Sequence, residues 1–243
     1  MYIDGISIGI INMFLFSIVV LARKLISNEG LEEFLIIKKE LKWNLFWEGS
    51  LMGFLLILGY VFLTIIFRVG NLNFTFKMRG DFLVTFLSFI FGFAAVALFE
   101  ESLFRDYLLL KLKKRFTTIK AVFFSSLIFS LVHIFSYIST GPLTVIALFN
   151  AYIIGIILAL IVVKTESIMW ALGFHFLWNL TQTVFLTVES SIFSLELNRG
   201  FLAGTPYIPE AGILVTIILV ILSLYMVDRF TETNIIPRRI GNG

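Results

Sequence analysis

The chain has 243 residues, of which 59% are hydrophobic and 14% are charged. A soluble domain carries about a quarter charged residues, so the composition indicates an integral membrane protein. The absence of cysteine excludes disulfides, thiolate nucleophiles and cysteine-ligated metals. The net charge of +3 gives no sign of a nucleic-acid partner.

Seven apolar runs are long enough to cross the hydrocarbon core of a bilayer as helices, for which about 17–25 residues are needed. They span residues 3–22, 49–67, 82–107, 120–139, 143–163, 167–188 and 211–227. The segment 28–48 mixes acidic, basic and aromatic residues, which suits a helix in the membrane interface or a plain linker helix. The pattern predicts an all-α, polytopic transmembrane bundle of about seven helices that forms one integral membrane domain, 1–243.

The lysine and arginine residues divide unequally between the connections. If alternate connections lie on the same side, fourteen basic residues fall on one side of the membrane and four on the other, with Arg105 inside a span. The positive-inside rule places the larger group in the cytoplasm. We therefore expect an external N-terminus and a cytoplasmic C-terminus, in the plasma membrane of a bacterium. The connection 189–210, with Gly200, Gly204, Pro206 and Pro209, is either a lid or a simple loop.

Few strongly polar, ionisable side chains interrupt the predicted spans. A charge in mid-membrane costs at least a few kcal/mol, so such residues usually face a bundle interior. Glu101 precedes Arg105 by four positions, which is the favourable register for a helical ion pair. Glu100 lies about 100° further round the helix and is left without this partner. Asp106 lies near the helix exit, where we expect it to be solvated.

The two histidines of the chain, His133 and His175, are predicted to lie near Glu100. A rise of 1.5 Å per residue puts Glu100 about 10–15 Å, His175 about 12 Å and His133 about 20 Å from the cytoplasmic end, and helix tilt can absorb part of the difference. Asn179 follows His175 by four residues on the same helical face. A carboxylate base, imidazoles that hold a water and an amide that donates to an oxyanion suit hydrolysis. Interhelical hydrogen bonding is the structural alternative.

Three motifs resemble those of the CAAX prenyl protease and bacteriocin-processing family (CPBP, also called Abi) of intramembrane proteases. Glu100-Glu101-x-x-x-Arg105 is similar to its EExxxR motif, and Phe129-Ser-Leu-Val-His133 to its FxxxH motif. His175-Phe-Leu-Trp-Asn179 is similar to its HxxxN/D motif. The motifs occur in the family's order, each on its own predicted helix. The resemblance covers about 82–188, which we interpret as the catalytic core.

This resemblance implies an endopeptidase that cuts a membrane-associated peptide or protein, either a prenylated C-terminal tail or a peptide precursor. It implies that Glu100 activates water with His133, and that His175 and Asn179 hold the oxyanion. Glu101 and Arg105 would be a supporting pair.

Members of the family are often labelled metalloproteases, which raises the question of zinc. A catalytic zinc takes three protein ligands plus water. If a metal is present, His133, His175 and Glu100 are its ligands, and only Glu101 is left as a base. Because Glu101 is expected to pair with Arg105, we favour hydrolysis without a metal cofactor.

Two other classes of function fit parts of the pattern. A catalytically idle membrane protein of the same fold could act in bacteriocin immunity or as a regulatory scaffold. An ion-coupled transporter could use Glu100 as its proton site, but it would be expected to have repeats or helices broken near mid-membrane. The four prolines, at positions 142, 206, 209 and 237, all lie away from the middle of a predicted span, which places the transporter last.

Overall fold

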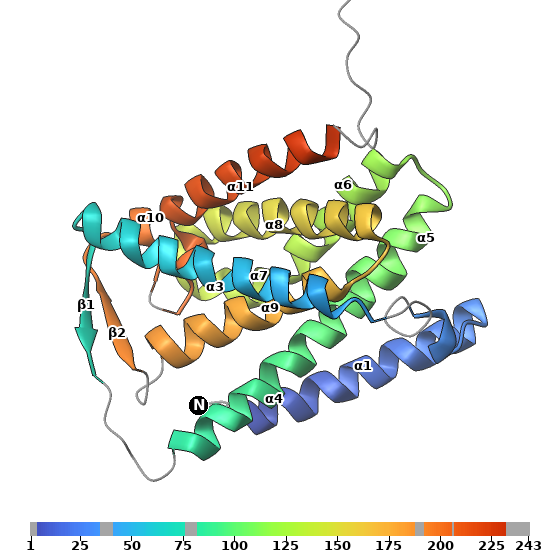
Figure 1. Cartoon of the computed structure of the whole chain (residues 1–243), viewed down its shortest axis with the longest axis horizontal. Helices are drawn as coiled ribbons and strands as arrows, with labels where there is room; N and C mark the ends of the chain where they lie inside the picture. The colour runs from blue at the N-terminus through green and yellow to red at the C-terminus, as the bar shows by residue number, and fades with distance from the viewer. Residues whose placement is uncertain (1–3, 35–40, 76–81, 188–191, 206, 232–243) are drawn as a thin grey trace, which may run out of the picture.

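The computed structural model describes residues 4–34, 41–75, 82–187, 192–205 and 207–231, and these residues are mostly helical (Figure 1). The long helices correspond in order to the predicted spans: α1 (Gly5–Ser27), α3 (Trp43–Ile66), α4 (Phe82–Glu101), α6 (Thr118–Val132), α8 (Thr144–Thr165), α9 (Met169–Gln182) and α11 (Ile213–Thr231). They pack as pairs, with α1 along α4, α3 on α9 and α6 on α8, and α4 also contacts α9. The predicted helical membrane bundle is therefore confirmed.

Within the described residues, four helical stretches are long and apolar enough to span a membrane: Gly5–Ser27, Trp43–Ile66, Phe82–Lys113 and Ile134–Thr165. Thr118–Val132 and Ile213–Met226 are apolar but shorter. The count of seven spans therefore stays a prediction. The sidedness does too, and residues 232–243 of the predicted cytoplasmic tail lie outside the described chain.

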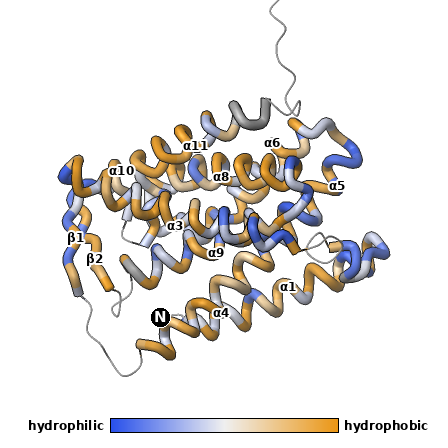
Figure 2. Tube along the Cα trace, in the orientation of Figure 1, coloured by the Kyte–Doolittle hydropathy of each residue, from blue (hydrophilic) through white to orange (hydrophobic). Residues whose placement is uncertain are grey.

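The outer surface of the long helices is apolar, as a lipid environment requires. Figure 2 shows hydrophobic residues along the helices, while hydrophilic residues gather around α5, at the C-terminal end of α1 and along β1. Large side chains that are more than half exposed occur on α1, α3, α4 and α8, and include Phe14, Phe62, Leu83 and Val145. Contact with lipid removes this surface from water, in agreement with an integral membrane protein.

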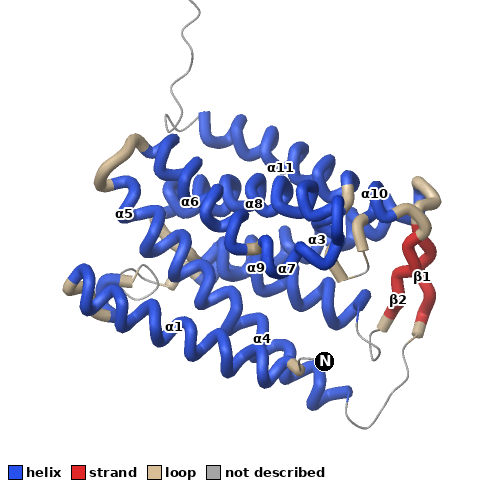
Figure 3. The backbone as a smooth tube through the Cα atoms, turned by 180° about the vertical axis from the view of Figure 1, so that it is seen from behind, coloured by secondary structure: helices blue, strands red, loops and turns tan. Residues whose placement is uncertain are grey.

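Short elements connect the long helices: η1 (Leu31–Glu33), β1 (Gly70–Phe74), η2 (Ser102–Leu108), α5 (Leu109–Lys113), α7 (Ile134–Tyr137), η3 (Ile138–Leu143), η4 (Thr183–Thr187), β2 (Phe193–Leu197), α10 (Gly200–Ala203) and η5 (Pro209–Ala211). Strands β1 and β2 pair antiparallel, from Gly70 opposite Leu197 to Phe74 opposite Phe193, and Figure 3 shows them at one end of the bundle. We predicted no strand, although both segments alternate apolar and polar residues: GNLNF in β1 and FSLEL in β2.

The described parts of 28–48 do not form a separate helix, and only residues 43–48 are α-helical. Residues 31–33 form a single 3-10 turn, and residues 43–48 already belong to α3. Residues 35–40 lie outside the described chain. The second long helix therefore begins six residues earlier than the predicted span at 49.

Glycines allow α3 and α9 to approach each other closely. A Cβ added at Gly49 would collide with the backbone carbonyl of Trp170, and one added at Gly173 would collide with that of Phe46. Small residues at such contacts let helix backbones pack tightly in membranes, where dispersion drives association. This contact fixes the position of α9 and, with it, that of His175 two residues after Gly173.

Asp106 is buried, so its expected solvation is wrong. Its carboxylate lies 2.8 Å from the Arg23 guanidinium, and the two residues are 1% and 2% exposed. Arg23 follows the predicted span 3–22 directly but lies within α1, and it also contacts Glu29 at 3.1 Å and the ring of Phe34 at 3.9 Å. Because α1 packs along α4, its C-terminal end brings this arginine to Asp106.

Asp106→Asn should lower the stability of the folded protein. Removal of one partner from a buried ion pair leaves the other charge poorly compensated. We expect a loss of up to about 3 kcal/mol, at the low end of the range for such pairs, because Glu29 still contacts Arg23. Thermal unfolding in detergent would measure it, with Glu196→Gln, which removes an exposed carboxylate, as the control. Equal melting temperatures for the two variants would contradict the prediction.

Candidate active site

Two adjacent glutamates end α4 and point to different surroundings. The helix continues beyond them to Lys113, but residues Ser102–Leu108 form the π-helical segment η2 rather than the uninterrupted α-helix expected to 107. Such wider turns occur frequently at functional sites. Glu100 lines a cavity, whereas the Glu101 side chain is fully buried.

The predicted ion pair between Glu101 and Arg105 is present, with Arg105 Nη1 3.2 Å from Glu101 Oε1. Both side chains are buried, and the guanidinium lies 3.9 Å from the centre of the Phe129 ring. A buried arginine is thus neutralised by one carboxylate and covered by an aromatic face. These contacts leave Glu100 outside the pair.

Glu101 has a second partner that the sequence did not reveal. The same oxygen, Oε1, lies 2.9 Å from His175 Nδ1, across 74 positions of sequence. A carboxylate accepts hydrogen bonds, so this contact favours the tautomer in which Nδ1 carries the proton. Glu101 therefore orients the His175 ring and directs Nε2 toward the cavity.

His133 lies at the junction between α6 and α7, where the predicted span 120–139 is interrupted. Its Nδ1 lies 2.7 Å from the carbonyl oxygen of Phe129, one turn earlier. Because a carbonyl oxygen can only accept, Nδ1 donates, and in the neutral ring Nε2 is an acceptor. The four-residue spacing of Phe129 and His133 thus supplies the contact that orients the imidazole.

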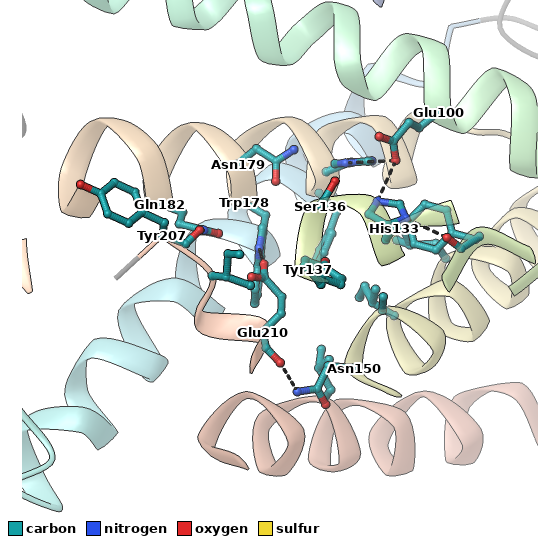
Figure 4. Close-up of a pocket in the computed structure, with 18 residues that line it drawn as sticks. Glu100, His133, Ser136, Tyr137, Asn150, Trp178, Asn179, Gln182, Tyr207 and Glu210 are labelled. Carbon is teal, nitrogen blue, oxygen red and sulfur yellow. Dashed lines mark hydrogen bonds and ion pairs between the residues drawn. The ribbon is translucent and has the colours of Figure 1, made fainter. Parts of the chain in front are cut away.

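Glu100 meets both imidazoles. Its Oε2 lies 3.6 Å from His133 Nε2 (Figure 4) and 3.8 Å from His175 Nε2. This oxygen is buried and has no hydrogen-bond partner among the described residues. Asn179, one turn after His175 on α9, lines the same cavity. The structure therefore brings together all four residues that the sequence analysis placed in one cavity.

The cavity has a volume of about 260 Å³ and includes polar residues that the sequence analysis missed. They are Ser136, Tyr137, Asn150, Trp178, Gln182, Tyr207 and Glu210. Helical spacing could have indicated Trp178 and Gln182, which follow His175 by three and seven residues on one face of α9. Tyr207 and Glu210 come from the connection predicted as a lid or loop, of which residues 189–191 and 206 lie outside the described chain.

The side chains of this site can be compared with the ligands that a catalytic zinc requires. No group of three or more His, Asp or Glu side chains in the described chain is arranged as a ready metal site. The three nearest donors are His133, His175 and Glu100. A zinc on these three would leave two other carboxylates nearby: Glu101, whose Oε1 contacts both Arg105 and His175, and Glu210, which accepts a hydrogen bond from Trp178. Since both are held by these contacts, the residues do not fit a catalytic zinc that works with its own glutamate base.

Comparison with known proteins agrees with the site. Residues 82–181 match the family model described as type II CAAX prenyl endopeptidase Rce1-like. No curated protein and no solved structure matches the chain. The matched segment runs from α4 to the end of α9 and includes the three motifs and their side-chain cluster. Through this segment the chain is similar to the Rce1-like type II CAAX prenyl endopeptidases.

Proposed function

We propose that this protein is an intramembrane endopeptidase that hydrolyses a peptide bond of a membrane-associated peptide or protein with a water activated by Glu100. The observation that carries the proposal is the buried Glu100 Oε2, which has no hydrogen-bond partner among the described residues and faces two imidazole nitrogens. A carboxylate that lies outside the buried arginine pair and beside two imidazoles can take a proton from a bound water.

The contacts of the two histidines suit them to different tasks. His133 Nδ1 donates to a neutral carbonyl, so Nε2 of this ring can accept a hydrogen bond from the water beside Glu100. His175 Nδ1 donates to the Glu101 carboxylate, which stabilises an imidazolium as the aspartate of a catalytic triad does. A protonated His175 can donate from Nε2 into the cavity.

The proposed reaction has two steps. In the first, the water oxygen attacks the carbonyl carbon, Glu100 takes the water proton, and His175 and Asn179 donate hydrogen bonds to the oxyanion. In the second, the carbon–nitrogen bond breaks and Glu100 passes the proton to the leaving amine. The products are a new carboxylic acid and a new amine, and Glu100 is again a carboxylate. Arg105 and Glu101 hold His175 in place without contacting the substrate.

The function is tested by cleavage of membrane-embedded peptides. The purified protein in liposomes, incubated with a library of apolar peptides, should cut internal bonds, which mass spectrometry of the products identifies. Glu196→Gln, whose carboxylate lies outside the cavity, should cut at the wild-type rate. If folded wild-type protein cuts no peptide of the library, a catalytically idle role in immunity or as a scaffold is supported instead.

Chelation should leave this activity intact, because the proposed base is a free glutamate. We expect zinc well below one equivalent per chain by elemental analysis, and the same cleavage rate before and after treatment with a chelator. One tightly bound metal per chain would reverse the assignment, provided that His133→Ala removes it. Activity that is lost on chelation and restored by zinc would do the same.

A further inference from the structure

A second free carboxylate enters the cavity from the connection between β2 and α11. Glu210, in η5, accepts a hydrogen bond from Trp178 Nε1 to its Oε1 at 2.7 Å. Its backbone carbonyl accepts another from Asn150 Nδ2 at 2.7 Å. Figure 4 shows the side chain extending from this segment toward Trp178. Contacts from α8 and α9 thus hold Glu210 in place.

Glu210 lines the same cavity as the catalytic groups, and its hydrogen-bond donor Trp178 lies about one helical turn from His175. Trp178 follows His175 by three residues on α9, a rise of about 4.5 Å. An extended peptide advances about 3.3 Å per residue. A substrate held at His175 would therefore place a side chain one or two residues from the scissile bond beside Glu210.

The described lining of the cavity has two carboxylates, and its basic side chains are the imidazoles of His133 and His175. Glu100 and Glu210 are the carboxylates among the described lining residues, and none of these residues is a lysine or arginine. Arg105 is not among the lining residues, and its buried side chain pairs with Glu101. Burial raises the pKa of the Glu210 carboxyl, and the indole of Trp178 offers it a neutral donor only. A cation beside Glu210 would compensate the buried charge, whereas a second carboxylate would be repelled.

We propose that Glu210 is a substrate-binding residue that selects peptides with a lysine or arginine side chain within about two residues of the scissile bond. The same carboxylate disfavours a free C-terminal carboxylate at that position. This inference rests on the proposed endopeptidase function and narrows its substrate class to cationic membrane-associated peptides.

A charge scan of one cleaved peptide tests the proposal. Lysine, norleucine or glutamate is placed in turn at each of the three positions on either side of the scissile bond, and kcat/KM is measured in liposomes of neutral lipid. At one or two positions we expect lysine to exceed norleucine by at least about tenfold, and glutamate to be the poorest. Elsewhere the three peptides should be cut at similar rates.

The variant Glu210→Gln tests whether the carboxylate of Glu210 causes the preference for lysine. Its amide oxygen can still accept from Trp178, and the lysine-to-norleucine ratio should fall to about one. The ratio is measured within each variant, so a partial loss of folded protein cancels. Glu196→Gln should keep the wild-type ratio.

Two results would overturn the inference and leave the proposed function standing. One is equal cleavage of the three peptides by the wild type at every position, and the other is an unchanged lysine preference in Glu210→Gln. Failure of the folded wild type to cut any peptide would overturn both proposals.

Discussion

Glu100→Gln should lower the turnover rate by about 10²–10⁴-fold, the range that general-base catalysis supplies, while the protein stays folded. The amide has nearly the same shape as the carboxylate but cannot take a proton from water. Glu100 is not the partner of Arg105, so its neutralisation leaves the buried ion pair intact. Turnover in liposomes, normalised to the amount of folded protein, measures the effect.

Glu101→Gln is the matched comparison, one residue further along the same helix. This change removes the carboxylate that contacts both Arg105 and His175. The variant should lose thermal stability because it leaves a buried guanidinium without its counter-charge, and it should also lose activity as His175 becomes disordered. Equal losses of stability in the two variants would contradict this division of roles.

Asn179→Ala should lower the turnover rate by about 10²–10³-fold and leave KM nearly unchanged. An oxyanion donor acts on charge that develops only in the transition state, so its loss lowers the rate rather than substrate binding. The side chain lies one turn from His175 and lines the cavity beside Glu100, as this role requires. Steady-state kinetics on one membrane-embedded peptide would separate the two parameters.

The structural alternative for Asn179 predicts a different result. If its amide served only as an interhelical hydrogen bond, Asn179→Ala would lose about 1 kcal/mol of stability and keep its rate per folded molecule. An unchanged rate would therefore exclude the oxyanion role. The same result in His175→Ala would favour the idle scaffold.

The parts of the fold that sequence alone predicts are those set by local patterns. Apolar length predicted the long helices, and the four-residue spacing of Glu101 and Arg105 predicted their ion pair. Helix rise and orientation then placed Glu100, His133 and His175 at depths close enough to meet. Each of these features depends on the sequence of one helix or on the depth of that helix in the membrane.

The contacts that sequence did not predict depend on how helices pack. His175 and Glu101 are 74 positions apart, and Arg23 and Asp106 are 83 apart, so neither pair has a spacing that a local rule recognises. The π-helical turn after Glu101 has no sequence pattern of its own. Glu210 was missed because it enters the cavity from a connection, and the folding of a connection depends on the helices around it.

A single turnover in water enriched in heavy oxygen tests most directly whether Glu100 activates water. Wild-type protein in excess over one cleavable peptide, in liposomes, should give a product whose new C-terminal carboxylate contains one heavy oxygen atom in the first turnover. Glu100→Gln should give almost no product in the same time. A first-turnover product without heavy oxygen would show that Glu100 attacks the peptide itself, and a product formed equally by Glu100→Gln would remove this carboxylate from the reaction.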